Sequence, residues 1–400
     1  MNKKGALGTV FLVVLVDLIG FGIVLPGLHF YASEFNSSPW LIGVLYSSYS
    51  FAQLVFSPVW GSVSDRVGRR PVMMISTFSA SLAYLLFGLS HSFAMLLVSR
   101  IFAGIMAGNI STAQAYVADV TSESERIKGM GLIGAAFGIG FVLGPAAGGI
   151  IMSVFKQNHY LIVGLFASAL SLLSFLLVSF LLPESVQLSR NEDNQRIEKI
   201  GIFSGQFWRF VGEAQSAGGI FLWLLLSVFL LTLGQASIYE AFPFFCNVHL
   251  NLGERQVYMQ YVWMGLVAVL IQGGLIRRLE KIFGEKRLFV TGCAVMAVGL
   301  GSIPFAASLG TLTFIMIVMT IGASLSGPSL NSLVSKQAPA SRFGITMGIS
   351  QSFSALARAI GPTWGGVLLG LSYQAPFLIT ALLVSTTLAV GFKLLRESAC

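Results

Sequence analysis

Long apolar runs separated by short polar breaks fill almost the whole chain. Each run is roughly 20 to 30 residues long, which is what a helix needs to cross a hydrocarbon core of about 30 Å. The alternating segments of about ten residues that are typical of outer-membrane barrels are absent. The pattern therefore predicts an all-α integral membrane protein. We expect twelve transmembrane helices, at residues 6–29, 40–63, 71–91, 93–118, 129–153, 159–182, 219–247, 256–276, 287–308, 310–335, 343–371 and 374–394.

One long polar stretch interrupts this pattern between the sixth and seventh predicted helices. It runs from Glu184 to Gln215 and contains charges of both signs. We therefore expect an N-terminal six-helix bundle at 1–183, a cytoplasmic linker at 184–217 and a C-terminal six-helix bundle at 218–400. Part of the linker has the spacing of a short amphipathic helix that lies on a membrane surface, formed by Ile200, Phe203, Phe207, Trp208 and Val211.

The composition excludes a soluble enzyme or binding domain. Hydrophobic residues make up 55% of the chain and charged residues only 10%, whereas a soluble domain carries about 25% charged residues. The three cysteines are too widely separated for a disulfide framework or a metal cluster. Zinc-protease, GxSxG and phosphate-loop motifs are absent as well. We expect no enzymatic activity, no metal and no organic cofactor.

The positive charge lies on one side of the predicted helices. Segments on the side of the N-terminus hold 20 of the 24 Lys and Arg residues and account for the whole net charge of +8. By the positive-inside rule, both termini are cytoplasmic and the protein lies in the cell (inner) membrane. This distribution points to membrane topology and anionic lipid as the reason for the basic charge, not to nucleic acid.

The two predicted halves repeat each other in sequence. Pro26 recurs as Pro243, and the Gly144-Pro145 pair recurs as Gly361-Pro362, both at an offset of 217 residues. Such a duplication predicts two pseudo-symmetric six-helix halves related by an axis along the membrane normal, with a substrate path between them.

Three motifs carry a family resemblance. The segment after the second predicted helix is Gly61-Ser-Val-Ser-Asp65-Arg66-Val-Gly68-Arg69-Arg70-Pro71; the fourth helix contains Leu96-x-x-x-Arg100-x-x-Ala103-Gly104, and the fifth contains Gly140-x-x-x-Gly144-Pro145-x-x-Gly148-Gly149. With twelve helices, these motifs resemble the major facilitator superfamily. The Gly-Pro motif is similar to the signature of its drug:proton antiporters, and residues 10–150 resemble the bacterial tetracycline exporters.

The resemblance implies a secondary active transporter that works by alternating access. It also implies gating residues at the cytoplasmic face, where Asp65 is expected to interact with a helix dipole and Arg66, Arg69 or Arg70 is expected to pair with Asp119. The Gly-Pro motif residues are expected to let a neighbouring helix approach closely and to limit leak; plain helix packing is the alternative. These motif residues are Gly140, Gly144, Pro145, Gly148 and Gly149.

Four charges fall inside predicted helices: Asp17, Arg100, Glu240 and Arg358. A charge at mid-bilayer costs a few kcal/mol and rarely occurs without a role. Our hypothesis is that Asp17 or Glu240 is the proton-coupling carboxylate and that a nearby arginine modulates it. The alternative is two ion pairs that only fix helix packing.

Polar and aromatic residues within the helices are candidates for a substrate cavity: Tyr46, Tyr49, Gln53, Asn109, Gln114, Gln235, Tyr239, Tyr261, Asn331 and Gln351. The sequence departs from the tetracycline exporters at Ser81-Leu82-Ala83-Tyr84, where they have an acid in place of Ala83. It also lacks their His in the eighth helix and Asp in the ninth. We therefore do not expect tetracycline as the substrate. We expect a monomer that exports amphipathic small molecules by proton-coupled antiport. The alternative is a carrier for one metabolite, such as a siderophore, lipid or sugar derivative.

Overall fold

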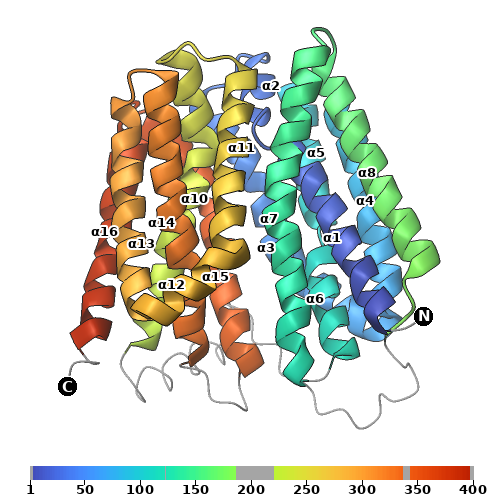
Figure 1. Ribbon diagram of the computed structural model, residues 1–400. Coiled ribbons are helices and arrows are strands. Elements are labelled where there is room, and N and C mark those ends of the chain that lie inside the picture. Colours follow the sequence, from blue (N-terminus) through green and yellow to red (C-terminus); the bar gives the residue numbers. More distant parts are fainter. Residues whose placement is uncertain (1–2, 122, 186–219, 337–342, 397–400) are drawn as a thin grey trace. The chain divides into compact units, whose positions relative to one another are not determined.

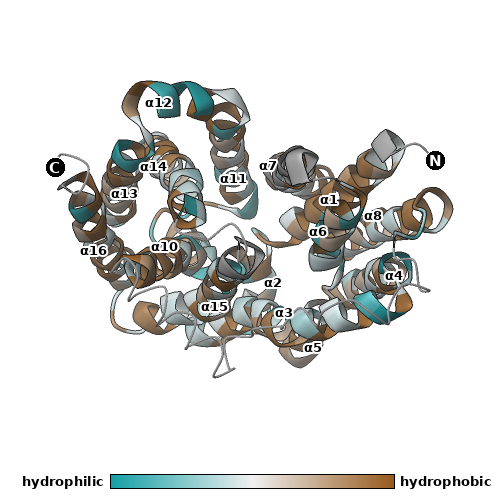
Figure 2. Cartoon of the chain, turned by 90° about the horizontal axis from the view of Figure 1, so that it is seen from below, coloured by the Kyte–Doolittle hydropathy of each residue, from teal (hydrophilic) through white to brown (hydrophobic). Residues whose placement is uncertain are grey.

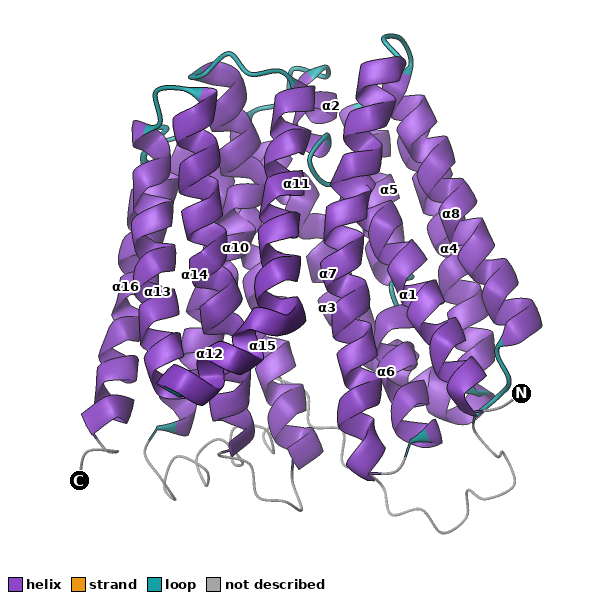
Figure 3. Ribbon diagram, in the orientation of Figure 1, coloured by secondary structure: helices purple, strands orange, loops and turns teal. Residues whose placement is uncertain are grey.

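The computed structural model describes residues 3–121, 123–185, 220–336 and 343–396 (Figure 1). These residues form helices and connecting turns, with no strand among them (Figure 3). Within this part of the chain, nine helices are long and apolar enough to cross a membrane. The prediction of an all-α membrane protein is confirmed, whereas the number twelve remains a prediction. The amphipathic helix expected in the linker lies outside the described residues.

The chain divides into two compact units. The first consists of residues 1–38, 48–197 and 252–265, and the second of residues 39–47, 198–251 and 266–400. Two helices, α3 (Pro39–Val67) and α11 (Glu254–Leu270), therefore contribute to both units. The predicted division into two six-helix bundles and a linker remains a proposal.

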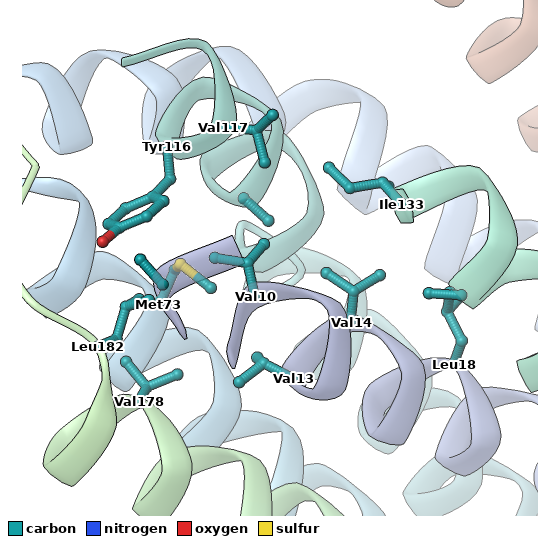
Figure 4. Packing of buried hydrophobic residues seen from close by; sticks show 13 residues of the cluster. Val10, Val13, Val14, Leu18, Met73, Tyr116, Val117, Ile133, Val178 and Leu182 are labelled. Atoms are coloured by element: carbon teal, nitrogen blue, oxygen red, sulfur yellow. The ribbon is translucent and has the colours of Figure 1, made fainter. Parts of the chain in front are cut away.

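The first unit is built around α1 (Lys3–Val24), which packs against α7 and α8. Its further helices are α2 (Leu28–Ser33), α4 (Arg69–Gly88), α5 (Phe93–Ile105), α6 (Asn109–Val120), α7 (Glu123–Val154) and α8 (His159–Leu181). Apolar side chains from five of these helices meet along α1 between Ala6 and Leu18 (Figure 4). Val10 and Val14 of α1 contribute to this cluster together with Met73 of α4 and Tyr116 of α6, and all four are at most 1% exposed.

The second unit is built around α10 (Phe221–Val248), which packs against α15 and α16. Its further elements are the π-helical turn η2 (Ile271–Leu275), α12 (Ile276–Phe283), α13 (Glu285–Ser302), the 3-10 turn η3 (Ile303–Phe305), α14 (Leu309–Lys336), α15 (Phe343–Leu369) and α16 (Ala375–Arg396). Glycines bring two of these helices into backbone contact. A Cβ added to Gly292 of α13 would lie 2.9 Å from the carbonyl oxygen of Gly322 of α14.

The structure corrects the expected end of the first transmembrane helix. α1 ends at Val24, and a turn containing Pro26 separates it from α2. Proline has no N–H to donate to the preceding turn, so a helix commonly ends near it. The repeat-related Pro243 does not have this effect, because α10 continues through it.

The fourth predicted helix is also interrupted. Residues 106–108 separate α5 from α6, and side chains from α4 and α3 hydrogen-bond to the backbone around this break. Ser76 Oγ donates to the Met106 carbonyl at 2.7 Å and accepts from the Gly108 N–H at 3.1 Å. Trp60 of α3 donates to the Ile105 carbonyl at 2.6 Å. Non-helical backbone at membrane depth requires such partners. The residue that follows this break, and begins α6, is the candidate Asn109.

Candidate transport site and gating contacts

Asp17 lies at the centre of a polar group in the first unit. It is half-buried on α1, and the Asn109 side chain at the start of α6 lies against it. The Tyr84 phenol of α4 is also close enough to interact with it. Because Asn109 directly follows the break between α5 and α6, this break determines where its amide meets α1.

Tyr84 interacts with both Asp17 and Arg100. The guanidinium is 3% exposed and lies over two aromatic rings, with its Cζ 5.6 Å from the Tyr84 ring centre and 5.1 Å from that of Phe87. No carboxylate of the described residues forms a salt bridge with it, and its Nε and Nη2 have no hydrogen-bond partner there. The structure therefore places an acid, a phenol and a buried cation in sequence, and not a direct Asp17–Arg100 ion pair.

An aromatic wall flanks the acid. Phe21 lies one helical turn beyond Asp17 on α1; its ring centre is 5.3 Å from that of Tyr49 on α3 and 6.1 Å from that of Phe141 on α7. The candidate Asn109 thus lies against Asp17, and the candidate Tyr49 lies beside Phe21, one helical turn along α1 from that acid. Gln53 and Gln114 are half-buried on α3 and α6 in the same unit.

Tyr84 was missed by the sequence analysis. It follows Ala83, the position at which tetracycline exporters have an acid, and only the missing acid was considered there. The useful signal was a tyrosine inside an apolar helix, because a buried phenol normally interacts with a polar partner.

The second unit contains the other candidate proton-coupling acid. Glu240 of α10 is fully buried, and its chain neighbour Tyr239 stacks on Tyr46 with ring centres 6.5 Å apart. Arg358 of α15 is half-buried and close enough to Tyr239 to interact with its phenol. Of the remaining candidates, Gln235 is half-buried, Tyr261 of the first unit is 7% exposed, and Asn331 and Gln351 are exposed.

Where α3 ends and α4 begins, one arginine joins two other predicted gating residues. Arg69 contacts Asp65 at 2.6 Å and Asp119 at 3.0 Å, and it also donates to Ser64 Oγ at 2.6 Å. Arg66 is exposed. Of the three arginines considered, Arg69 makes the predicted pair with Asp119.

Glu184 completes this network and was not predicted. Its two carboxylate oxygens accept from the backbone N–H groups of Arg69 at 2.8 Å and Arg70 at 3.1 Å. These are the first residues of α4, so the carboxylate caps a helix N-terminus that lacks intrahelical acceptors. Arg70 in turn donates to the carbonyl of Ser179. Gly68, with φ of +104°, makes the turn between α3 and α4.

The Gly-Pro motif brings α7 into close contact with α1 and α11. A Cβ added to Gly144 would lie 2.7 Å from the Cα of Gly22 on α1, and Pro145 lies beside the same glycine. One turn further on, Gly148 lies under the ring of Tyr258 from α11. Tyr258 donates to the Ile23 carbonyl at 2.8 Å and therefore joins α11 to the end of α1.

The repeated motif makes an equivalent contact in the second unit. Gly361 of α15 lies against Ala236 of α10, where an added Cβ would be 2.6 Å from the Ala236 Cβ. Next to Pro362, Thr363 donates its backbone N–H to Ser47 Oγ at 3.0 Å, and its hydroxyl lies 2.8 Å from the same oxygen. Ser47 belongs to the first turns of α3, so α3 joins α15 much as α11 joins α7.

A second acidic group lies where α11 begins. Glu254 accepts a hydrogen bond from Tyr160, and its Oε2 is 3.6 Å from His159 Nε2. Tyr31 of α2 stacks on Tyr160 with ring centres 4.1 Å apart. Burial, aided by Glu34, raises the pKa of Tyr31 to about 12, so this phenol stays protonated and donates to the Ser90 carbonyl at 2.7 Å.

Apolar spanning helices, buried acids and arginines within them, and a repeated Gly-Pro motif define a polytopic membrane transport protein. The chain belongs to the Major Facilitator Superfamily, whose profile matches residues 10–362 and again residues 275–399. Members of this family are transporters and not enzymes.

Known resistance proteins are similar to this chain over most of its length. It is 27% identical to the Escherichia coli tetracycline resistance protein, class B, over 372 residues, which cover 90% of this chain and 87% of that protein. It is 28% identical to the Bacillus subtilis (strain 168) multidrug resistance protein 2 over 377 residues, with 92% and 91% covered. Among solved structures, the human organic anion transporter MFSD10 (TETRAN) superposes with a TM-score of 0.71 at 25% identity, covering 98% of this chain and all of that one.

Proposed function

We propose that this protein is a proton-coupled antiporter that exports amphipathic small molecules by alternating access. It lies in the cell membrane with both termini in the cytoplasm. The observation that carries the proposal is the placement of Asp17 beside Asn109, Tyr84 and an aromatic wall at a break in a membrane helix. The resistance proteins among its relatives support export as the direction of transport.

Burial away from water raises the free energy of an ionised side chain. A carboxylate with few polar partners is costly in its ionised form, so it is stable either with a proton or beside a positive charge. Asp17 has an amide and a phenol beside it and Arg100 further off, so proton uptake and substrate binding compete for the same carboxylate. That competition couples the two fluxes. Glu240, fully buried in the second unit, is the second candidate for this role.

The test is drug-driven proton flux into liposomes that enclose a pH-sensitive dye. Asp17→Asn and Glu240→Gln keep the side-chain volume and remove the proton-binding group, while Glu34→Gln removes an exposed acid and serves as the matched control. We expect one of the two buried substitutions to abolish the proton flux. The same variant should still exchange labelled for unlabelled substrate, because that exchange moves no net proton. Two fully coupled amide variants would refute the proposal.

A second function is favoured by Arg100. Its buried guanidinium with two unpartnered nitrogens is suited to an anionic group, and the MFSD10 neighbour is an organic anion transporter. On this alternative the protein is a carrier for one metabolite with an acidic group. A panel of cationic and anionic substrates separates the two: proton flux driven only by anions, and lost in Arg100→Gln, would establish the carrier.

A further inference from the structure

The helical segment that contains the eighth predicted span is longer than a membrane requires. The continuous helical segment Glu254–Phe283 has 30 residues. At 1.5 Å per residue it would measure about 45 Å, against a hydrocarbon core of about 30 Å. Its last third is not an ordinary continuation of α11, because η2 inserts a π-helical turn before α12 begins. Gly273 and Gly274 lie in this turn with open space around them.

α12 runs across the other helices of its unit. In the view of Figure 2, α13, α14 and α16 are seen nearly end-on, whereas α12 is seen from its side at the edge of the unit. One face of α12 holds it there. Ile276 and Leu279 pack against a small apolar cluster that includes Leu288 of α13 and Leu325 of α14.

The opposite face of α12 is basic. Arg277, Arg278 and Lys281 are all exposed, and at 100° per residue they occupy one arc of the helix. Within the described part of the chain, none of them forms a salt bridge. The basic residues nearby differ in this respect, because Lys336 pairs with Glu285, and Lys286 donates to the Leu394 carbonyl at 3.0 Å.

An exposed apolar edge adjoins this basic face. Leu275 is 46% exposed and Ile282 is 70% exposed, and both lie between the basic arc and the packed face. The one acid of α12, Glu280, lies on the far side of the helix from Ile282 and leaves the helix with a net positive charge. Basic and apolar faces side by side, on a helix that lies across a transmembrane bundle, are typical of helices at the membrane interface.

We propose that α12 is an interfacial helix that binds anionic phospholipid headgroups of the cytoplasmic leaflet. The guanidinium groups of Arg277 and Arg278 and the Lys281 ammonium bind headgroup phosphates, while Leu275 and Ile282 insert at the boundary of the acyl chains. The proposal concerns lipid and not cargo, so it holds whichever substrate the protein carries. It also gives three of the basic residues a role beyond membrane topology.

Phosphatidylglycerol binding to the purified full-length protein, measured by native mass spectrometry, tests this surface. The variant R277Q/R278Q/K281Q removes the basic face, and K156Q/R255Q/K393Q removes the same charge elsewhere. We expect affinity to fall roughly fivefold for each basic residue lost from α12, with little change in the control. E280Q should strengthen binding. Equal losses in both triple variants, or none in the α12 variant, would overturn the proposal.

Two further arms identify the ligand and keep the test independent of variant folding. Phosphatidylcholine should bind equally to all variants, and soluble glycerol 3-phosphate should not compete; competition would assign the site to a soluble anion instead. A spin label at Ile282→Cys in a C400S background reports depth, because Cys246 and Cys293 are buried. In vesicles with phosphatidylglycerol we expect contact with oxygen and protection from a water-soluble nickel chelate. A label open to the nickel chelate would place α12 in water and refute insertion.

Discussion

A single methyl group on the Gly-Pro motif tests the contact between α7 and α11. In Gly148→Ala, the new Cβ would lie 3.0 Å from Cδ1 and Cζ of Tyr258 and closer still to Cε1. These are ring atoms with no freedom to bend away, so the whole ring has to move. Moving it weakens the 2.8 Å hydrogen bond from the Tyr258 hydroxyl to the Ile23 carbonyl.

The magnitude follows from three effects. Overpacking a tight contact costs about 1–3 kcal/mol. Loss of the hydrogen bond adds about 1 kcal/mol, because a buried carbonyl is left without its donor. Replacing glycine by alanine inside a helix returns about 0.5–1 kcal/mol. We expect Gly148→Ala to destabilise the protein by about 1–3 kcal/mol.

The neighbouring glycine is a matched control. A Cβ on Gly149 would lie 3.4 Å from the Tyr258 Cβ, which is ordinary contact. Gly149→Ala should therefore be neutral or slightly stabilising. Thermal unfolding in detergent measures both, and we expect the Gly148 variant to unfold a few °C lower than the Gly149 variant.

A double-mutant cycle with Tyr258→Ala isolates the contact. If the ring is the obstacle, Gly148→Ala should cost almost nothing once the ring is removed, which gives a coupling energy of about 1–3 kcal/mol. Two outcomes would refute a steric clash with the ring. One is an equal loss of stability in Gly148→Ala and Gly149→Ala; the other is a Gly148→Ala destabilisation that persists in the Tyr258→Ala background.

Three further substitutions test the other contacts. Arg69→Gln should reduce transport severalfold, because it leaves the carboxylates of Asp65 and Asp119 without their arginine, and the protein should stay folded. Arg66→Gln changes an exposed residue and should transport normally in the same flux assay. Glu184→Ala should lower unfolding stability by about 1 kcal/mol through loss of the α4 cap, and a wild-type melting temperature would contradict this. Ser47→Ala should cost about 1–2 kcal/mol, because the Thr363 N–H loses its acceptor, and unchanged stability would contradict it.

The predictable part of this protein is what a bilayer imposes on a chain. Twenty-residue apolar runs and one-sided charge follow directly from the thickness and polarity of a membrane, so the fold class was confirmed. Interruptions were missed, because the break at residues 106–108 depends on the Ser76 hydroxyl, which lies on another helix. Hydropathy averages over such a break and does not register the side chains on other helices that hydrogen-bond its backbone.

Site chemistry was predictable only where a charge marks it. Asp17 and Arg100 are conspicuous because a charge inside a membrane has a high free energy, but the side chain that interacts with both of them is uncharged. Tyr84, which lies between them, belongs to the 32 Phe, 10 Tyr and 6 Trp residues of the chain and has no local signature. Glu184 was read as the start of a polar linker, since a carboxylate that caps a distant helix N-terminus looks like any other surface acid.

The sequence duplication has a structural consequence that neither motif shows alone. The first turns of α3 belong to the unit that contains α15, and the first turns of α11 belong to the unit that contains α7. In each case a side chain from the incoming helix meets a Gly-Pro motif: Tyr258 meets Gly148, and Ser47 meets Thr363. The two contacts use different chemistry, a ring over a glycine in one and a hydroxyl at a backbone N–H in the other. The pairing of an incoming helix with a Gly-Pro helix is therefore repeated in the two units, whereas the chemical group that makes the contact differs between them.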